Sequence, residues 1–290
     1  MEFSGILNVL KPTGMTSHDV VNKIRKITGQ KKVGHTGTLD PNVAGVLPIC
    51  LGKGTKISNY LMEGNKKYLC ECHLGILTDT YDKYGKVLEK NETINMNLHD
   101  IEKALKKLKT KKTQKPPIYS AVRYKGKKLY EYARKNQDIE IKERYINILD
   151  IDLVSILNNT IILKAEVSKG TYMRSLCYDL GKLLNSYGTM GNLIRLESKG
   201  FNIFESFTLE ELEEKAYNNK LDRCIVSIEE ALILPSISIS NEDGKKILNG
   251  LFIDFEDTSL KEPFYIFNEE KLLGFGEYRQ DKLKMKKRLC

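Results

Sequence analysis

The sequence contains no long hydrophobic run. Nowhere in its 290 residues does a stretch approach the roughly 18 consecutive apolar residues of a membrane-spanning helix. The first twelve residues, MEFSGILNVLKP, also lack the basic region, apolar region and small-residue cleavage site of a secretory signal. We therefore expect a cytoplasmic protein without a membrane partner.

Cysteine is sparse and scattered. The six cysteines stand at positions 50, 70, 72, 177, 224 and 290 without a compact framework of spacings, so we expect free thiols rather than structural disulfides. The run Cys70-x-Cys72-His73 has no second Cys/His pair at a zinc-site spacing. Its alternation with Tyr68 and Leu74 is typical of one face of a strand. We expect no metal site.

The common phosphate-binding and hydrolase motifs are also missing. The sequence has neither a G-x-x-x-x-G-K-[ST] loop nor a strand-coupled G-x-G-x-x-G, and it has no H-E-x-x-H pair and no G-x-S-x-G elbow. A nucleotide cofactor is not indicated, and we expect no cofactor.

The charge that is present is positive and concentrated. The formal net charge is +9, and residues 103–128 hold eleven Lys and Arg with no Asp or Glu. Tyr119, Tyr124 and Tyr130 lie within or beside this segment as possible stacking surfaces. Such a segment can neutralise phosphates and stack on bases, which favours a nucleic-acid partner. Composition alone leaves a solvated basic face equally open.

Local patterns predict helices and strands in irregular order. Thr16-x-x-Asp19 resembles a capping box, and Gly29 ends the apolar stripe that follows it, which predicts a helix between them. Further helices are expected around 101–108, at 172–186 and after Thr208, and strands near 6–9, from Tyr68 onward, at 145–154 and at 160–168. Because there is no regular βαβ alternation, we predict the α+β fold class.

A break near Pro235 divides the chain. After it, Ser240-x-x-Asp243 opens a helix that Gly250 closes, and residues 282–285 alternate basic with apolar residues as a half-buried strand does. We predict one domain over residues 1–234 and a small domain over 235–290.

The densest signal for chemistry is the glycine-rich loop 34–45, which contains Gly34-His35-Thr36-Gly37-Thr38-Leu39-Asp40-Pro41. Its glycines permit a tight backbone path, and Pro41 biases Asp40 away from helical geometry, so the carboxylate stands on a shaped loop. Such a loop can present a reactive group, although Asp-Pro and glycine-rich stretches are usually only turns.

This loop resembles the catalytic motif of the bacterial tRNA pseudouridine 55 synthases of TruB type, whose relatives include the dyskerin-type synthases. Four more motifs resemble that family, in order along the chain: residues 11–17, Lys67-Tyr68, residues 116–121 and residues 168–174. The resemblance spans residues 11 to about 201. It implies a mixed, largely antiparallel sheet flanked by helices, an RNA-binding insertion at about 109–145 and, more weakly, a PUA-like RNA-binding domain at 235–290.

The resemblance also implies an activity, the isomerisation of uridine 55 in the T arm of tRNA to pseudouridine. An ionised aspartate can attack the ribose or stabilise a cationic sugar, and Asp40 matches the family's nucleophile. Arg174 matches the arginine that keeps it charged, and Tyr68 matches the tyrosine that stacks on the uracil and transfers a proton. On residues alone, a helix-surface cation is the preferred interpretation of Arg174, and a ring that only packs is the commoner role for a buried tyrosine such as Tyr68.

Other positions match residues that bind the substrate. By resemblance, His35 contacts flipped-out T-loop nucleotides, and Tyr172 and Leu193 line the pocket, while Lys11 and Pro12 belong to the N-terminal motif that we assign to substrate binding. The target uridine must leave its stack, which costs a few kcal/mol. We expect a monomer that uses tRNA and no guide RNA.

Three alternatives remain. A guide-dependent synthase usually carries a longer C-terminal domain and tails than this chain has. A glycosidase would pair Asp40 with Asp79 or Asp82, although residues 78–82 are more simply a turn between strands. A non-catalytic RNA-binding or RNA-folding protein would not need Asp40 for any activity.

Overall fold

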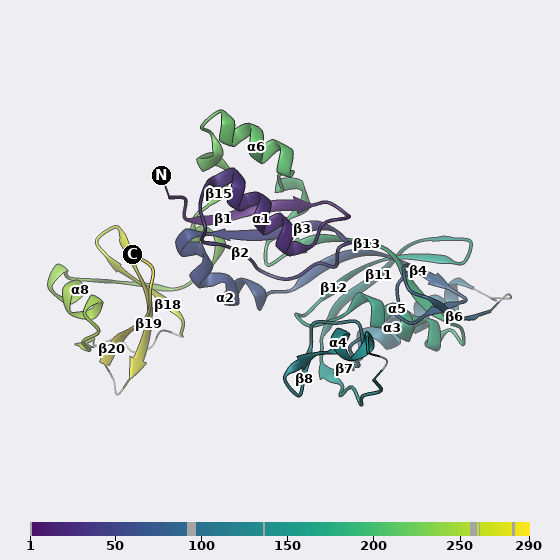
Figure 1. Cartoon of the computed structure of the whole chain (residues 1–290). Helices are drawn as coiled ribbons and strands as arrows, with labels where there is room; N and C mark the ends of the chain where they lie inside the picture. The colour runs from purple at the N-terminus through teal and green to yellow at the C-terminus, as the bar shows by residue number, and fades with distance from the viewer. Residues whose placement is uncertain (1, 92–96, 136, 256–259, 261, 280–281) are drawn as a thin grey trace.

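The computed structural model describes residues 2–91, 97–135, 137–255, 260, 262–279 and 282–290 (Figure 1). The remaining positions of the predicted insertion and of the predicted C-terminal domain, 136, 256–259, 261 and 280–281, lie outside the described residues. Among the helices described, none is long and apolar enough to cross a membrane.

A central sheet of nine described strands runs through most of the chain. Its main path, in spatial order, is β11 (Ile148–Leu157), β12 (Thr160–Val167), β4 (Lys66–Leu74), β13 (Gly188–Ser198), β3 (Ala44–Leu51), β1 (Gly5–Lys11) and β15 (Ile225–Val226). β2 (Val33–His35) pairs with β3, and β14 (Phe201–Asn202) pairs with β13. The β3–β13 pair is parallel and the other ladders are antiparallel. The mixed sheet with flanking helices confirms the predicted α+β class.

The first helix, α1 (Ser17–Thr28), follows the predicted signals closely. Thr16 and Asp19 form a capping box, and Gly29 adopts the left-handed conformation at the C-cap. Its buried residues Val20, Val21 and Ile24 pack into the main core. Capping and an apolar stripe together fix both ends of this helix and the face that it buries.

Strand β4 confirms the predicted alternation. Cys70, Cys72 and Leu74 are buried. The sulfur atom of Cys70 lies 3.6 Å from that of Cys177 on α5 (Met173–Leu183), and both are free thiols. The predicted strand at 145–154 lies three residues later, because residues 144–145 pair with a different strand. The apolar faces of α3 (Leu98–Lys109) and α5 complete the core on this side of the sheet.

Shorter elements complete the part of the chain before the C-terminal sheet. The short strands form three pairs: β5 (Ile76–Thr78) with β6 (Val87–Lys90), β7 (Thr113–Gln114) with β10 (Arg144–Tyr145), and β8 (Arg123–Tyr124) with β9 (Lys127–Lys128). The helical segments are η1 (Gly52–Ile57), α2 (Ser58–Met62), α4 (Leu129–Ala133), η2 (Ile203–Glu205), α6 (Leu209–Tyr217), η3 (Leu221–Cys224) and α7 (Ile228–Ala231). Figure 1 shows α4, β7 and β8 projecting from one side of the central sheet.

The C-terminal part has its own sheet, in the order β16 (Ser236–Ile239), β18 (Phe264–Asn268), β19 (Lys271–Arg279), β20 (Lys282–Arg288) and β17 (Ile253–Asp254), with α8 (Asn241–Leu248) beside it. It docks through a second apolar cluster that joins Tyr265 and Phe275 to residues of β1 and β3. The Tyr265 hydroxyl donates to the backbone carbonyls of Ile228 and Leu232. Apolar and polar contacts therefore anchor the C-terminal sheet to the rest of the chain.

Candidate active site

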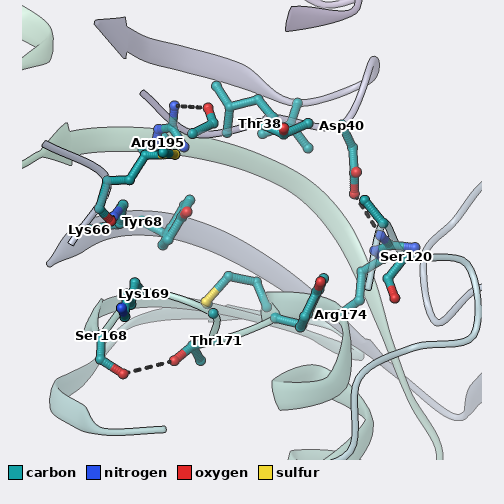
Figure 2. A pocket seen from close by; sticks show the side chains of 18 of the residues that line it. Thr38, Asp40, Lys66, Tyr68, Ser120, Ser168, Lys169, Thr171, Arg174 and Arg195 are labelled. Carbon is teal, nitrogen blue, oxygen red and sulfur yellow. Dashed lines mark hydrogen bonds and ion pairs between the residues drawn. The ribbon is translucent and has the colours of Figure 1, made fainter. Parts of the chain in front are cut away.

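A cavity of about 700 Å³ opens beside the central sheet, where five separate segments meet. Its walls come from the loop 36–43, the end of α2, the start of β4, the insertion and the residues around the start of α5, and Leu193 and Arg195 of β13 line it as well. Figure 2 shows Asp40 and Arg174 on one side of this cavity and Lys66 and Arg195 on the other. The cavity thus gathers residues from four of the five motifs noted in the sequence.

The loop that carries Asp40 is held by hydrogen bonds on both sides. The Ser17 hydroxyl, at the start of α1, bonds both the backbone N–H and the carbonyl of Leu39. The carbonyl of Pro41 accepts from the backbone N–H of Gly14 at 2.9 Å. These bonds fix the backbone before and after Asp40, whose side chain stays 47% exposed on the cavity wall.

Arg174 meets Asp40 from the first turn of α5. Its Nη2 lies 2.9 Å from Asp40 Oδ2, while its own side chain is only 7% exposed (Figure 2). A charge-assisted hydrogen bond of this length fixes the position of the carboxylate on the cavity wall. The predicted Asp40–Arg174 pair is therefore brought together in the structure.

A second carboxylate, Asp82, shares the same guanidinium. Its Oδ2 lies 3.7 Å from Arg174 Nη1, and its Oδ1 accepts from the Thr80 hydroxyl and the Tyr84 backbone N–H. The predicted turn between strands is confirmed, because residues 79–86 connect β5 and β6. Sequence reasoning considered Asp82 only as a glycosidase carboxylate, and no local signal identified it as a partner of Arg174.

Three predicted side chains line the cavity between these charges and its far end. Tyr68 projects from β4, Leu193 is buried on the neighbouring β13, and Tyr172 is the N-cap of α5. Burial raises the pKa of Tyr172 above its ordinary value, which keeps the phenol protonated at neutral pH. The arrangement offers an aromatic and aliphatic slot beside an ionised carboxylate.

Lys11 differs from the prediction of a substrate-binding residue. Its side chain is completely buried, and its ammonium donates to the carbonyls of Pro12, Met15 and Pro41. Burial lowers the pKa of Lys11 to about 8, against the opposing effect of the nearby Asp40 charge. With its ammonium donating to three carbonyls, Lys11 holds the loop that carries Asp40 rather than meeting a ligand. Its neighbour Pro12 is exposed.

His35 stands at the end of β2, half-buried and next to the cavity-lining residues Thr36 and Gly37. Burial lowers the pKa of His35 below 6.5, with the charge of Arg195 as a further cause. The Nδ1 atom accepts a hydrogen bond from the Gly37 backbone N–H at 3.3 Å. His35 is thus an uncharged imidazole at neutral pH, so it can contact a ligand by packing and hydrogen bonding but not through a positive charge.

Sequence reasoning also missed two buried cations. Arg195 is 1% exposed and Lys66 is 7% exposed, and both line the cavity. The only signals were Arg195 after Leu193-Ile194 and Lys66 before Lys67-Tyr68, and neither pattern predicts burial. The close approach of Gly45, whose φ is +121°, leaves no room for a β-carbon, because such an atom would lie 2.2 Å from the Arg195 carbonyl oxygen.

The predicted insertion, at about 109–145, also contributes to the cavity that contains Asp40 and Arg174. Arg174 Nη2 donates to the carbonyl of Tyr119 at 3.0 Å, and the amide of Gln114 exchanges two hydrogen bonds with the backbone of Tyr172. Arg123 and Arg144 add exposed positive charge to the cavity rim. The basic segment therefore lies against the cavity rather than away from it.

Two family models match the chain. Residues 25–173 match the N-terminal domain of the TruB family of pseudouridylate synthases, and residues 174–233 match the tRNA pseudouridylate synthase B C-terminal domain. The tRNA pseudouridine synthase B of Clostridium kluyveri is 43% identical over 289 residues, which cover 98% of each chain. The protein of that name from Caldanaerobacter subterraneus is 47% identical over 255 residues, 87% of each chain.

Solved structures support the fold. A chain in a Cbf5-Nop10-Gar1 complex matches with a TM-score of 0.75 at 24% identity, over 99% of this chain and 85% of that chain. The motifs, the cavity that gathers them and the family matches agree with one another, and they exclude the glycosidase alternative. The chain belongs to the TruB family of pseudouridylate synthases, and it is an isomerase that converts uridine in RNA to pseudouridine.

Proposed function

We propose that this enzyme isomerises uridine 55 in the T arm of tRNA, and that Asp40 is its nucleophile. The names of the relatives from Clostridium kluyveri and Caldanaerobacter subterraneus support tRNA as the substrate. The observation that carries the proposal is the 2.9 Å ion pair between Asp40 and Arg174 on the wall of a nucleotide-sized cavity. Glu63 also lines this cavity, but it pairs with the exposed Lys169, whereas Asp40 is the lining carboxylate that pairs with the buried Arg174.

The reaction needs one bond broken and one bond formed. The Asp40 carboxylate attacks the ribose or stabilises it as a cation while the bond between C1′ and N1 of uracil breaks. The uracil turns within the cavity, and its C5 forms the new bond to C1′, which releases the carboxylate. The hydrogen on C5 leaves as a proton, and N1 gains one. Atoms and charge balance without a redox change, so no cofactor is needed.

Arg174 keeps the carboxylate ready for this role. When RNA covers the site and displaces water, an isolated carboxylate would be destabilised by several kcal/mol. The guanidinium at 2.9 Å offsets that loss, and Asp82 holds the other side of the guanidinium. The two carboxylates on one arginine fix its position, so Asp82 acts through Arg174.

The remaining cavity residues suit a flipped base. Tyr68 offers a ring for stacking on the uracil and a hydroxyl for proton transfer, while Leu193 and Tyr172 close the slot. Base–aromatic stacking is worth about 1–3 kcal/mol, comparable with the few kcal/mol that base flipping costs. The uncharged His35 and the exposed Pro12 are placed to contact T-loop nucleotides outside the cavity.

The rest of the chain binds the tRNA body. The basic insertion at about 109–145 grips the RNA over the cavity, within a catalytic domain of residues 1–234. Residues 235–290 act as a PUA-like RNA-binding domain, with the lysines of β20 toward phosphates. We place the enzyme in the cytoplasm as a monomer that works without guide RNA.

The test is direct. Purified protein is incubated with unmodified tRNA transcript in EDTA without added cofactor, and pseudouridine is mapped by base-resolved chemical probing, with Asp40→Asn alongside. Pseudouridine at the T-loop site with wild type alone is the expected result. Full activity in Asp40→Asn would refute the nucleophile, and tight binding without conversion would favour the guide-dependent or RNA-folding alternative.

A further inference from the structure

The cavity contains a second charged centre with no part in the chemistry described above. In Figure 2, Lys66 and Arg195 lie at the opposite end of the labelled set from Asp40 and Arg174, with Tyr68 between the two groups. Lys66 and Tyr68 stand two residues apart on β4 and so face the same side of the sheet. Arg195 is the cross-strand partner of Tyr68 on β13. Neighbouring strands thus direct both cations to one end of the cavity.

Within the part of the chain that the structure describes, neither cation forms an ion pair, and the nearest carboxylate to Lys66 in the cavity wall, Glu63, pairs with Lys169 instead. Lys66 Nζ donates to the carbonyls of Met62 at 2.6 Å and Gly64 at 2.5 Å. Arg195 donates from Nε to the Val46 carbonyl at 2.7 Å and from Nη2 to the Gly37 carbonyl at 3.1 Å. Neutral carbonyls satisfy some of the donors but do not neutralise either positive charge, and Glu63 offsets that of Lys66 only in part.

Donors are left over as well. A lysine has three N–H donors and an arginine has five, and the bonds just described use two of each. Among the described residues, Arg195 Nη1 has no hydrogen-bond acceptor, although it lies on the Gly37 side of the cavity. Unused donors on buried cations at a cavity wall are the features of a site that is completed by an anion.

The electrostatics support the same conclusion. Burial and, after it, the positive charge of Arg195 lower the pKa of Lys66 to about 8, against the smaller opposing effect of the Glu63 charge. Two desolvated cations that repel each other are costly for the fold. An incoming anion relieves both the desolvation and the repulsion, so it binds more favourably here than at an exposed lysine.

We propose that Lys66 and Arg195 form a subsite for a phosphodiester of the substrate RNA, one of the two phosphates that flank the flipped uridine. The inference rests on the proposed function, because it takes RNA as the ligand. A guanidinium fork and an ammonium are the groups that bind phosphate oxygens in proteins. With the ribose at Asp40 and the base on Tyr68, the subsite holds the backbone of the target nucleotide and sets its depth in the cavity.

The chain supplies a matched control in Lys67. It carries the same charge on the next position of β4 but faces the other side of the sheet, where it pairs with Glu197 at 2.8 Å. Lys66→Met removes the buried charge and retains much of the apolar stem, and Lys67→Met removes an exposed one. Lys66→Gln keeps amide donors for the Met62 and Gly64 carbonyls, which guards against loss of the fold, and Lys66→Arg restores the charge.

The experiment measures the affinity of full-length protein, in an Asp40→Asn background, for a T-arm stem-loop RNA. The RNA carries a neutral methylphosphonate at the phosphate 5′ or 3′ of the target uridine. One of the two replacements is expected to weaken binding about tenfold when Lys66 is present and to have little further effect in Lys66→Met or Lys66→Gln. The slope of log affinity against log salt concentration should also decrease by the amount expected for about one phosphate contact in Lys66→Met, but not in Lys67→Met.

Equal losses from the methylphosphonates with and without Lys66, at both positions, would overturn the subsite and point instead to a contact with the uracil oxygens. Recovery of the phosphate dependence in Lys66→Arg is expected, and its failure would also count against a charge contact. Absence of tRNA conversion by the wild-type protein would refute the proposed function itself, which separates the two failures.

Discussion

Two arginines at this cavity are nearly equally buried and yet are compensated in different ways. Arg174 lies between the carboxylates of Asp40 and Asp82, whereas Arg195 donates only to backbone carbonyls. The first is neutralised within the protein and organises a reactive carboxylate. The second retains its charge. The role of a buried cation therefore depends on whether its acceptors are charged or neutral, and burial alone does not indicate that role.

The largest expected effect follows from removing Arg174. Arg174→Ala removes a buried guanidinium and leaves the partly buried Asp82 and the more exposed Asp40 without their shared cation. We expect the rate of pseudouridine formation to fall about a thousandfold in single-turnover assays. Arg174→Lys serves as the control and should recover part of the rate. A variant within tenfold of wild type would show that the ion pair is not needed.

The backbone contact beneath Arg195 should be the next most sensitive. Gly45→Ala places a β-carbon against the Arg195 backbone at a φ of +121°, so we expect a loss of about 3 kcal/mol in the free energy of unfolding. Gly200→Ala is the matched control, since Gly200 also has positive φ but open space around it, and should cost about 1 kcal/mol. Equal losses in denaturant titrations would mean that the contact with β13 contributes nothing.

A smaller effect is expected at Asp82. Asp82→Asn keeps the size of the side chain and its hydrogen bonds with Thr80 and Tyr84 but removes one charge from Arg174. We expect kcat to fall about tenfold while RNA affinity is unchanged, because the substitution reorients a positioning group. Loss of affinity without loss of kcat would instead make Asp82 a residue that shapes the RNA site.

The smallest effect is a pH dependence of RNA binding. The pKa of Lys66 is lowered to about 8, so its charge is complete well below pH 8 and is lost as the pH rises through that value. Affinity should fall about fivefold more between pH 7 and pH 9 in the wild type than in Lys66→Arg, whose guanidinium stays charged. Lys11 also has a pKa of about 8, but it is present in both proteins, so its titration does not contribute to the difference between their pH profiles. Identical pH profiles would remove Lys66 from the binding site.

The sequence predicted those parts of the fold that depend on near neighbours. The capping box at Thr16 and the glycine at 29 gave α1 correctly, and alternation gave the buried face of β4. The pairing of Asp40 with Arg174 was predicted from the family resemblance, not from a local pattern. The cap, the C-terminal glycine and the alternation are each encoded within a few residues of chain, which is the range over which caps and periodicity act.

The parts that were missed depend on distant partners. The parallel pairing of β13 with β3 brings Arg195 against Gly45, and no local pattern carries that register. Lys11 was expected to bind substrate because it belongs to the N-terminal motif, yet its ammonium donates to three backbone carbonyls. Asp82 reaches Arg174 only because the β5–β6 turn folds back over α5. Such contacts follow from the tertiary arrangement.

The hydrogen bond from Arg174 to the Tyr119 carbonyl joins the insertion to the proposed nucleophile through one side chain. An RNA that lets the insertion lie in this position completes the acceptors of Arg174, whereas an RNA that holds it away leaves one of them missing. The position of the insertion over the RNA and the hydrogen bonding of the arginine that pairs with Asp40 are therefore coupled through one side chain.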